Sequence, residues 1–151
     1  MLRVPHHRQI NEWTCGPASM AMALGAFGAR ASQAALAREA GTNAKRGTTR
    51  AGLVRTLRAH GLRATARHGR TLAEIERLRR DGRVVIVLYV ETEADEAHYA
   101  VFLGLSRGRV LLNDPWHGPR ASLARAEFLR RWRGTAKAWT RWACAIDRPV
   151  S

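Results

Sequence analysis

One cysteine in the sequence has a local setting that suits nucleophilic chemistry. Cys15 opens the tripeptide Cys-Gly-Pro, and residues 20–27 are apolar on all sides, which predicts a buried helix that begins near the cysteine. Pro17 fits the first turn of such a helix, where its missing N–H costs nothing. A thiol at this position lies at the positive end of the helix dipole, which favours the thiolate form. The alternative is that Cys15 is a small buried apolar residue.

Three further polar residues have the types that would complete such a site. Gln9 precedes Cys15 by six residues, so its side-chain amide and the Cys15 N–H can together form an oxyanion hole. His98 begins an apolar strand, 97–105, and can act as a general base. Asp114 follows the next expected strand and can orient the imidazole. Taken singly, each residue also fits an ordinary structural role. Gln9 can be a surface amide, His98 a solvated histidine at a strand end, and Asp114 an aspartate in a turn.

Hairpin register decides whether Asp114 or Asn113 shares a sheet face with His98. We expect a three-residue loop at 106–108, which places Leu105 opposite Arg109 and residue 100 opposite residue 114. Side chains of like parity then share a face, so Asp114 lies diagonally across from His98. A two-residue loop at 107–108 would put Asn113 there instead.

The elements that must position these residues follow an order of helices first and strands later. Capping residues and terminal glycines predict helices that begin after Ser32, after Thr48 or Thr49, and after Thr71, and a further helix is expected over 123–132. Strands are expected at 63–67, 84–90, 97–105, 109–113 and 138–146. This order predicts an α+β fold in which an N-terminal helical layer packs on a mainly antiparallel sheet.

Three stretches of the chain together resemble a known enzyme family. Residues 4–22 around Gln9 and Cys15, His98-Tyr99-Ala100-Val101, and Asn113-Asp114-Pro115 resemble the bacteriocin-processing, double-glycine-leader peptidases, which belong to the papain-like cysteine peptidases. The resemblance implies a papain-like fold with Cys15 as nucleophile, His98 as base, Asp114 as its orienter and Gln9 as oxyanion donor. It also implies a peptide or protein substrate and, as a partner, a separately encoded transporter. The local cysteine signature of papain itself is absent, which points to the bacterial branch of the group.

Composition limits the other classes of function. The 151 residues suit a single domain over 1–151, and the longest apolar run, Val84–Val90, is too short to span a membrane. Neither a secretory signal nor a disulfide framework is evident, so the expected compartment is the cytoplasm. The net charge of +14 raises the question of nucleic-acid binding. However, all but two of the 26 basic residues are arginines spread along the chain, which favours solvated helix faces.

Other conspicuous residues receive structural interpretations. Trp132, Trp139 and Trp142 are expected to pack the C-terminal helix on the last strand, and Cys144 to be an inert buried thiol. Trp13 and Trp116 adjoin the expected nucleophile and orienter in sequence, so they are candidates either for substrate-binding walls of the cleft or for simple packing. The pair His6-His7 has no further ligands at metal-binding spacing, so we expect no metal and no cofactor.

Four functions remain after these arguments. The first is a thiol peptidase that works through a Cys-His-Asp triad and a covalent acyl-enzyme. The second keeps the same first step but is an acyltransferase or a non-peptide amidase, because the residues do not distinguish water from another acceptor. The third is a non-catalytic peptide-binding domain, which the presence of Cys15 disfavours. The fourth is a basic nucleic-acid-binding domain.

Overall fold

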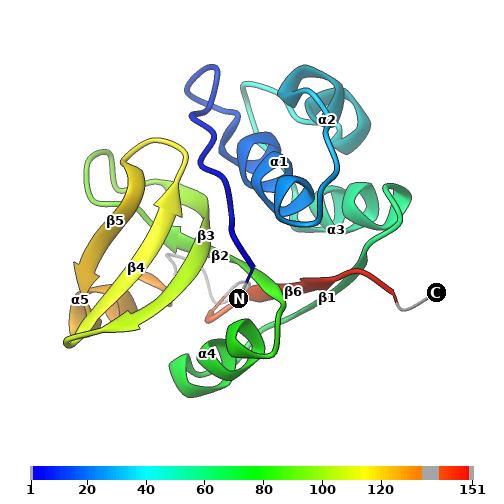
Figure 1. Cartoon of the computed structure of the whole chain (residues 1–151). Helices are drawn as coiled ribbons and strands as arrows, with labels where there is room; N and C mark the ends of the chain where they lie inside the picture. The colour runs from blue at the N-terminus through cyan, green and yellow to red at the C-terminus, as the bar shows by residue number, and fades with distance from the viewer. Residues whose placement is uncertain (1, 134–139, 150–151) are drawn as a thin grey trace.

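A six-stranded antiparallel sheet organises the computed structural model, which describes residues 2–133 and 140–149 (Figure 1). Its strand order is β1-β6-β2-β3-β4-β5, and each pair of neighbours is antiparallel. The mainly antiparallel sheet expected from the sequence is therefore confirmed. The strands are β1 (Arg63–Arg67), β2 (Val84–Val90), β3 (Ala97–Ser106), β4 (Arg109–Asp114), β5 (Gly118–Ala124) and β6 (Ala143–Asp147).

Helices cover both faces of the sheet (Figure 1). The first three form the expected N-terminal layer on one face: α1 (Cys15–Ala26), α2 (Gln33–Ala40) and α3 (Arg50–Ala59). On the other face lie α4 (Leu72–Arg80) and α5 (Arg125–Arg131). Side chains of Ser32, Thr49 and Thr71 cap α2, α3 and α4 by accepting a backbone N–H three residues on. Of the two alternatives before α3, Thr49 is thus the cap.

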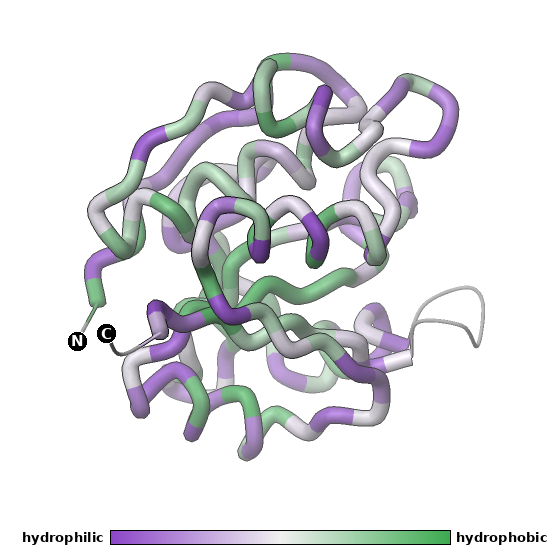
Figure 2. Tube along the Cα trace, turned by 90° about the vertical axis from the view of Figure 1, so that its right-hand side faces the viewer, coloured by the Kyte–Doolittle hydropathy of each residue, from purple (hydrophilic) through white to green (hydrophobic). Residues whose placement is uncertain are grey.

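The two helical layers explain the uninterrupted apolar run of β2. Val84, Ile86 and Leu88 face the α1–α3 layer, whereas Val85, Val87 and Tyr89 belong to the core on the side of α4 and α5. Because successive strand residues point to opposite faces, a central strand covered on both sides must be apolar throughout. In Figure 2 the hydrophobic colour accordingly runs through the middle of the molecule.

Two expectations for the C-terminal third are wrong in detail. Residues 118–124 form the edge strand β5, so Leu123 belongs to a strand and the helix begins only at Arg125. The last strand begins at Ala143, and of the residues expected before it, 138 and 139 lie outside the described part. The sequence did not predict β5, because this edge strand is half solvated and contains Pro119 and Arg120, which interrupt any apolar alternation.

The β3–β4 hairpin reaches the expected register near the site by an unexpected route. Its loop has two residues, Arg107 and Gly108, both with positive φ, so Ser106 pairs with Arg109 and the three-residue loop is wrong. A β-bulge between Phe102 and Gly104 then adds one residue to β3. Beyond the bulge Phe102 pairs with Leu112 and Val101 with Asn113, which is the register expected for the strand ends.

Helix α4 holds the bulge in place. Glu76 of α4 accepts a hydrogen bond from the Leu105 N–H at 3.0 Å and pairs with Arg79 at 2.7 Å. The Arg79 guanidinium lies against Gly104, where a Cβ atom would come within 2.9 Å of its Nε. Gly104 also has a φ of +129°, which favours glycine. Gly104 and the buried carboxylate of Glu76 therefore stabilise the bulge, and the turn does not contribute to it.

Of the three tryptophans expected to pack the C-terminal helix on the last strand, Trp132 lies in the core beside α5, whereas Trp142 is buried in the core on the other face of the sheet. Trp132 is fully buried beside Phe128 in the core under α5, and its Nε1 donates to the Trp142 carbonyl at 2.9 Å. Trp142 packs against Tyr99 in the other core. Trp139 lies outside the described residues. Among the helices that the structure describes, none combines the length and apolarity needed to cross a membrane.

Candidate active site

Three separate elements bring the expected site residues to one cleft. Cys15 is the first residue of α1, His98 the second residue of β3, and Asp114 the last residue of β4. A cleft of about 590 Å³ exposes part of Cys15 and His98, while Asp114 is fully buried. The cleft is lined by Gln9, Glu12, Trp13, Cys15, Ala44, Lys45, Arg46, Gly47, Glu91, Glu93, Ala94, Glu96, Ala97, His98 and Trp116.

Local sequence explains why the thiol lies at an uncapped helix start. Thr14 precedes α1, but its side chain bonds to the Asn11 backbone and does not cap the helix. The first turn also contains no acidic residue, so the positive end of the helix dipole is not neutralised from within the helix. At Gly16 a Cβ atom would come within 2.3 Å of the Thr48 hydroxyl, so glycine allows residues 47–49 to approach the thiol.

The imidazole of His98 links the buried carboxylate to the thiol. His98 Nε2 lies 2.7 Å from Asp114 Oδ1. Since this contact occupies Nε2, Nδ1 is the nitrogen left for Cys15, whose side chain interacts electrostatically with the imidazole. The structure thus brings together the three residues in the order that a nucleophile, a base and an orienting carboxylate require.

Burial and hydrogen bonding shift the pKa values of His98 and Asp114 in opposite directions. Burial favours the neutral imidazole, but the hydrogen bond with Asp114 and the interaction with Cys15 outweigh it and raise the pKa of His98 to about 10. Burial also disfavours the Asp114 carboxylate, yet the hydrogen bond with His98 and the positive imidazolium outweigh that effect and lower its pKa to about 2. The ionised pair, imidazolium and carboxylate, is therefore the favoured form at neutral pH.

Tyr89 is a site residue that the sequence reasoning missed. Its hydroxyl donates a short hydrogen bond to Asp114 Oδ2, and its ring meets the His98 ring edge-on at 5.8 Å. Burial and the adjacent Asp114 charge raise the pKa of Tyr89 above its usual range, so the hydroxyl remains a donor. A signal was present, because Tyr89 is the only residue with a polar tip in the run 84–90, and a buried hydroxyl needs a partner.

Two backbone N–H groups complete the surroundings of the Asp114 carboxylate. Those of Trp116 and His117 each donate to Oδ1 at 2.9 Å. Together with His98 and Tyr89 they give Asp114 four donors, as a fully buried carboxylate requires. Asn113 points elsewhere: its amide donates to the Val4 carbonyl at 3.0 Å and its oxygen accepts from the Arg120 N–H at 3.3 Å.

Gln9 lines the cleft as expected and is only 7% exposed. Its side-chain nitrogen donates one hydrogen bond to the Asn11 carbonyl at 2.7 Å, which leaves the second N–H of the amide available. Its Oε1 is buried without a partner among the described residues. The Gln9 backbone is anchored to the end of β4, because its N–H donates to the Pro115 carbonyl at 3.1 Å.

The whole N-terminal segment follows the end of β4. His6 Nε2 contacts the Asp114 carbonyl oxygen at 2.7 Å, and Arg8 donates to the Trp116 carbonyl at 3.2 Å. The segment also lies against α1, where Gly25 allows Pro5 to approach closely. It therefore connects the helix that bears Cys15 to the strand that bears Asp114. The Nε2 atom of His6 thus has a backbone contact.

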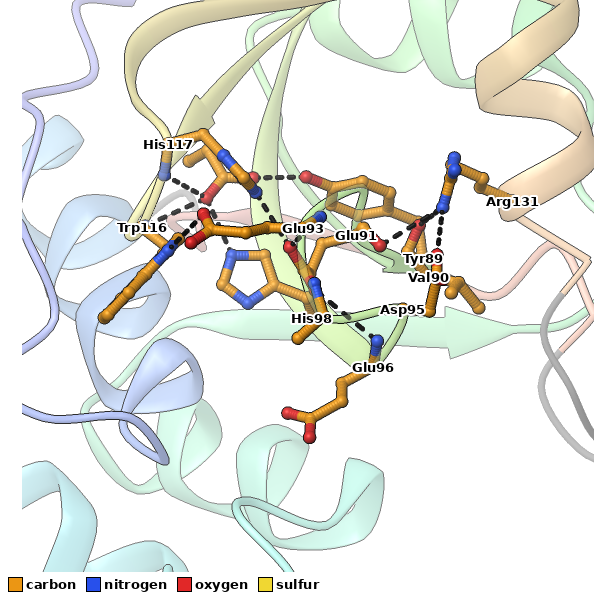
Figure 3. Close-up of polar contacts among 12 residues, drawn as sticks. Tyr89, Val90, Glu91, Glu93, Asp95, Glu96, His98, Trp116, His117 and Arg131 are labelled. Atoms are coloured by element: carbon orange, nitrogen blue, oxygen red, sulfur yellow. Dashed lines mark hydrogen bonds and ion pairs between the residues drawn. The ribbon is translucent and has the colours of Figure 1, made fainter.

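Trp13 and Trp116, the two candidates for the cleft wall, both border the cleft, and neighbouring side chains hold Trp116 in place. Trp116 Nε1 donates to Glu93 at 3.0 Å (Figure 3), and the Arg8 guanidinium lies 5.5 Å from the ring centroid. Trp13 lies on the loop before α1, where its N–H bonds to Asn11 at 3.0 Å. Of the two earlier alternatives, the structure therefore favours positions in the cleft wall over simple core packing.

A folded loop, residues 91–96, forms another wall. The buried Glu91 accepts hydrogen bonds from the N–H groups of Glu93, Ala94 and Glu96, and it contacts His117 at 2.9 Å (Figure 3). Arg131 binds the outer side of the loop through the Val90 and Glu91 carbonyls and Asp95. Glu91, Glu93 and His117 lie close enough to hold a cation, but each already has a hydrogen-bond partner, so we assign no metal there.

The sulfur lies where this cleft meets a second one. The second cleft, of about 540 Å³, also contains Cys15, Arg46, Gly47 and Ala97. Its remaining lining residues are Thr48, Thr49, Arg50, Ala51, Leu88 and Tyr99, and His98 is not among them. An extended ligand can therefore cross the sulfur with one part in each cleft. Cys144, in contrast, is buried in β6, and burial raises the pKa of its thiol to about 12.

Comparison with known proteins decides the family. Residues 3–141 match the sequence profile of the Peptidase C39 family. The chain belongs to this family. As a C39 member it is a cysteine peptidase, a hydrolase.

Two proteins of methanogenic archaea are similar in sequence to this C39 peptidase. An uncharacterized protein of Methanothermobacter thermautotrophicus is 34% identical over 126 residues, which cover 83% of this chain and 81% of the relative. A protein of Methanothermobacter marburgensis is 36% identical over 111 residues, covering 74% and 71%. Because both relatives are archaeal, an origin in bacteria stays a prediction.

Solved structures of C39 peptidase domains share the fold. The peptidase domain of Streptococcus ComA, a bifunctional ABC transporter of a quorum sensing pathway, has a TM-score of 0.76 at 20% identity, covering 97% of this chain and all (100%) of that one. A double glycine motif protease from an AMS/PCAT transporter, solved with its leader peptide, has a TM-score of 0.77 at 19% identity, covering 98% and 94%. A putative C39-like peptidase from Bacillus anthracis gives 0.74 at 17%, covering 99% and 96%.

Proposed function

We propose that this C39 peptidase cleaves a peptide bond through Cys15, His98 and Asp114, with Gln9 and the Cys15 N–H as the oxyanion hole. The observation that carries the proposal is the geometry of His98, whose Nε2 is held by Asp114 at 2.7 Å while the residue lines the same open cleft as Cys15. A nucleophile, a base and an oriented imidazole on three rigid elements suit acyl transfer through sulfur.

The chemistry then follows in two stages. In the reactive state His98 already holds the thiol proton as an imidazolium, so the sulfur attacks the peptide carbonyl as the thiolate, and the developing oxyanion accepts hydrogen bonds from the N–H groups of Gln9 and Cys15. The C–N bond breaks when the imidazolium donates its proton to the leaving amine, which leaves a thioester on Cys15. Water then attacks the thioester with His98 as base, which frees the new carboxylate and restores the thiol.

The proposed substrate is a precursor whose leader ends in small residues. The support is the likeness to a double glycine motif protease bound to its leader peptide and to the peptidase domain of a bifunctional ABC transporter. On the same basis we propose a transporter as partner and the cytoplasm as the compartment. Trp13 and Trp116 are the proposed contacts for substrate, because both border the cleft.

The test compares the two cysteines. A synthetic peptide with a Gly-Gly junction should be cleaved by the wild type and by Cys144→Ala, but not by Cys15→Ala. Iodoacetamide should label Cys15 much faster than Cys144, because Cys15 is half-buried beside a cationic imidazole whereas Cys144 is buried and its pKa is raised to about 12. Cleavage by Cys15→Ala, or equal labelling of both thiols, would show the proposed mechanism to be wrong.

A further inference from the structure

Carboxylates gather at the active-site cleft, although the chain has a net charge of +14. Loop 91–96 holds four of the chain's 12 acidic residues and no basic one. Three of the four, Glu91, Glu93 and Glu96, line the cleft, as does Glu12 from the loop before α1. On a chain rich in arginine, the cleft beside the sulfur thus contains four carboxylates.

Only part of this charge is used within the protein. Glu91 is occupied by its own loop and His117, Glu93 by Trp116, and Asp95 by Arg131. The Glu12 and Glu96 carboxylates are exposed, and neither has a hydrogen bond or ion pair with any residue in the described ranges. In Figure 3 the Glu96 side chain extends away from the other side chains drawn. These two carboxylates are therefore available to a ligand.

A second observation concerns an unpartnered polar atom at the same cleft. Gln9 is nine-tenths buried and lines the cleft, yet its Oε1 has no hydrogen-bond partner among the described residues. Buried side-chain oxygens are rarely left without a donor. Gln9, which lines the same cleft as the unpaired carboxylates, thus carries an acceptor without a donor from the described residues.

The position of His98 tells which part of the substrate meets these carboxylates. The imidazole must reach the leaving amine to protonate it, so the segment that follows the scissile bond lies on the His98 side of the sulfur. His98 lines the acidic cleft and is not part of the second one. The acyl part of the substrate then occupies the second cleft.

Two basic residues border the same cleft. Lys45 and Arg46, from the turn at 43–47, are among its lining residues, and Arg46 also borders the second cleft, which has no acidic residue among the described residues that line it. The carboxylates are therefore confined to the cleft on the His98 side. A cationic side chain that enters with the leaving segment is attracted to Glu12 and Glu96, and an anionic one is repelled there.

We propose that the natural substrate carries a lysine or arginine among the first few residues after the scissile bond, and that Glu12 and Glu96 select it. This inference rests on the proposed function, because it assigns the leaving segment to the His98 side. It goes beyond that function because it defines the charge of the segment that follows the scissile bond, whereas the proposed function concerns the leader that precedes it.

Three matched peptides test the proposal. They share one Gly-Gly junction and carry Arg, Gln or Glu at the second residue after it. For the wild type we expect kcat/KM to fall in the order Arg, Gln, Glu, with about 10-fold between the extremes, since each exposed ion pair contributes roughly 2- to 5-fold. The difference should shrink at high salt, because exposed charges are screened.

Two variants locate the effect. In Glu12→Gln/Glu96→Gln the preference for Arg over Glu should fall to about 2-fold or less, since both unpaired carboxylates are gone. Asp81→Asn removes one charge at the end of α4, on the other face of the sheet, and should keep the wild-type ratio. Iodoacetamide labelling of Cys15 should be unchanged in both variants.

The outcomes separate this inference from the function on which it rests. Equal cleavage of all three peptides by the wild type, or an undiminished ratio in the double variant, would overturn the charge selection while leaving the peptidase intact. If none of the peptides is cleaved, or if Cys15→Ala cleaves them as well as the wild type, the proposed function itself fails.

Discussion

At the scale of single residues, the buried Asp114 carboxylate dominates the electrostatics of the site. It accepts hydrogen bonds from His98, Tyr89 and two backbone N–H groups while fully hidden from solvent. Folding raises the pKa of His98 from 6.5 to about 10, so its contribution to stability is complete below pH 6.5 and is lost as the pH rises towards 10. Folding lowers the pKa of Asp114 from 3.8 to about 2, so its contribution is lost as the pH falls through that range. The pair should stabilise the fold most between these two ranges.

Tyr89→Phe should narrow, on its acidic side, the pH range in which the His98–Asp114 pair stabilises the fold. Removing the hydroxyl leaves Asp114 Oδ2 without a donor, which raises the pKa of Asp114 and changes the field that the carboxylate exerts on the His98 cation. We expect a loss of about 1.5–3 kcal/mol in the free energy of unfolding near pH 5. NMR titration of the His98 ring should give a pKa higher than in the wild type, because the carboxylate charge is no longer shared with the Tyr89 hydroxyl.

Tyr99→Phe is the matched control, because its hydroxyl donates to the Thr48 carbonyl at 2.8 Å and not to Asp114. This variant should leave the His98 titration where it is in the wild type. A Tyr89→Phe protein with an unshifted His98 titration would exclude the positioning role of Tyr89.

Gln9→Ala should reduce kcat by about 10²-fold, as expected for the loss of one oxyanion donor. The rate of Cys15 alkylation by iodoacetamide should stay nearly unchanged, because Gln9 acts on the developing oxyanion and not on the sulfur. The two rates can be measured on the same preparation. An equal fall in both would assign Gln9 a structural role in holding the N-terminal segment.

At the scale of elements, the bulge in β3 determines which residue of β4 reaches His98. If the register of the two-residue turn continued to the strand ends, Asn113 would share the His98 face. The extra residue between Phe102 and Gly104 reverses the parity and brings Asp114 there. The α4 helix, through Glu76 and Arg79, thus contributes to the site from the far side of the sheet.

Glu76→Ala should disturb the site through this bulge. It leaves the Leu105 N–H and the Arg79 guanidinium without their carboxylate, and we expect the free energy of unfolding to fall by about 1–3 kcal/mol. The pKa of His98 should fall as well, because Asp114 is no longer held in register. Denaturant unfolding and NMR titration measure the two effects.

Glu74→Ala provides the comparison on the same helix. Glu74 pairs with Arg67 and Arg70, away from the bulge, so its loss should lower stability without moving the His98 titration. Should Glu76→Ala also leave that titration in place, the bulge would be maintained without Glu76.

At the scale of the whole molecule, the N-terminal segment joins the helical layer to the sheet. Pro5 lies against Gly25 of α1, while Val4, His6 and Gln9 contact residues 113–115. The distance between the thiol and the carboxylate is therefore constrained by a segment outside every helix and strand. Gln9 is part of this segment, so any shift of the segment would displace Gln9.

Gly25→Ala should test this connection. The added Cβ would come within 2.6 Å of Pro5 Cγ, so the segment must shift and carry Gln9 with it. Because small displacements of catalytic groups are costly, we expect kcat to fall about 10-fold or more. A variant with wild-type kcat would show that the segment relaxes without moving Gln9.

The sequence by itself predicted the candidate site residues and determined most of the helices. Helix caps, terminal glycines and the placing of Cys15 at a helix start depend on contacts between residues close in the chain, so they can be predicted from local patterns. The resemblance that joined Cys15, His98 and Asp114 is likewise contained in short motifs, and the C39 profile confirms the family.

Only the tertiary structure decided how those residues meet. The edge strand β5, the bulge in β3 and the hydrogen bond from Tyr89 to Asp114 all depend on pairings between segments far apart in the chain. The expected register at Asp114 was correct, but the turn predicted to produce it was wrong, and the bulge supplied the missing residue. Strand pairing is set by packing against α4 and the neighbouring strands, and this information is not present in any local run of residues.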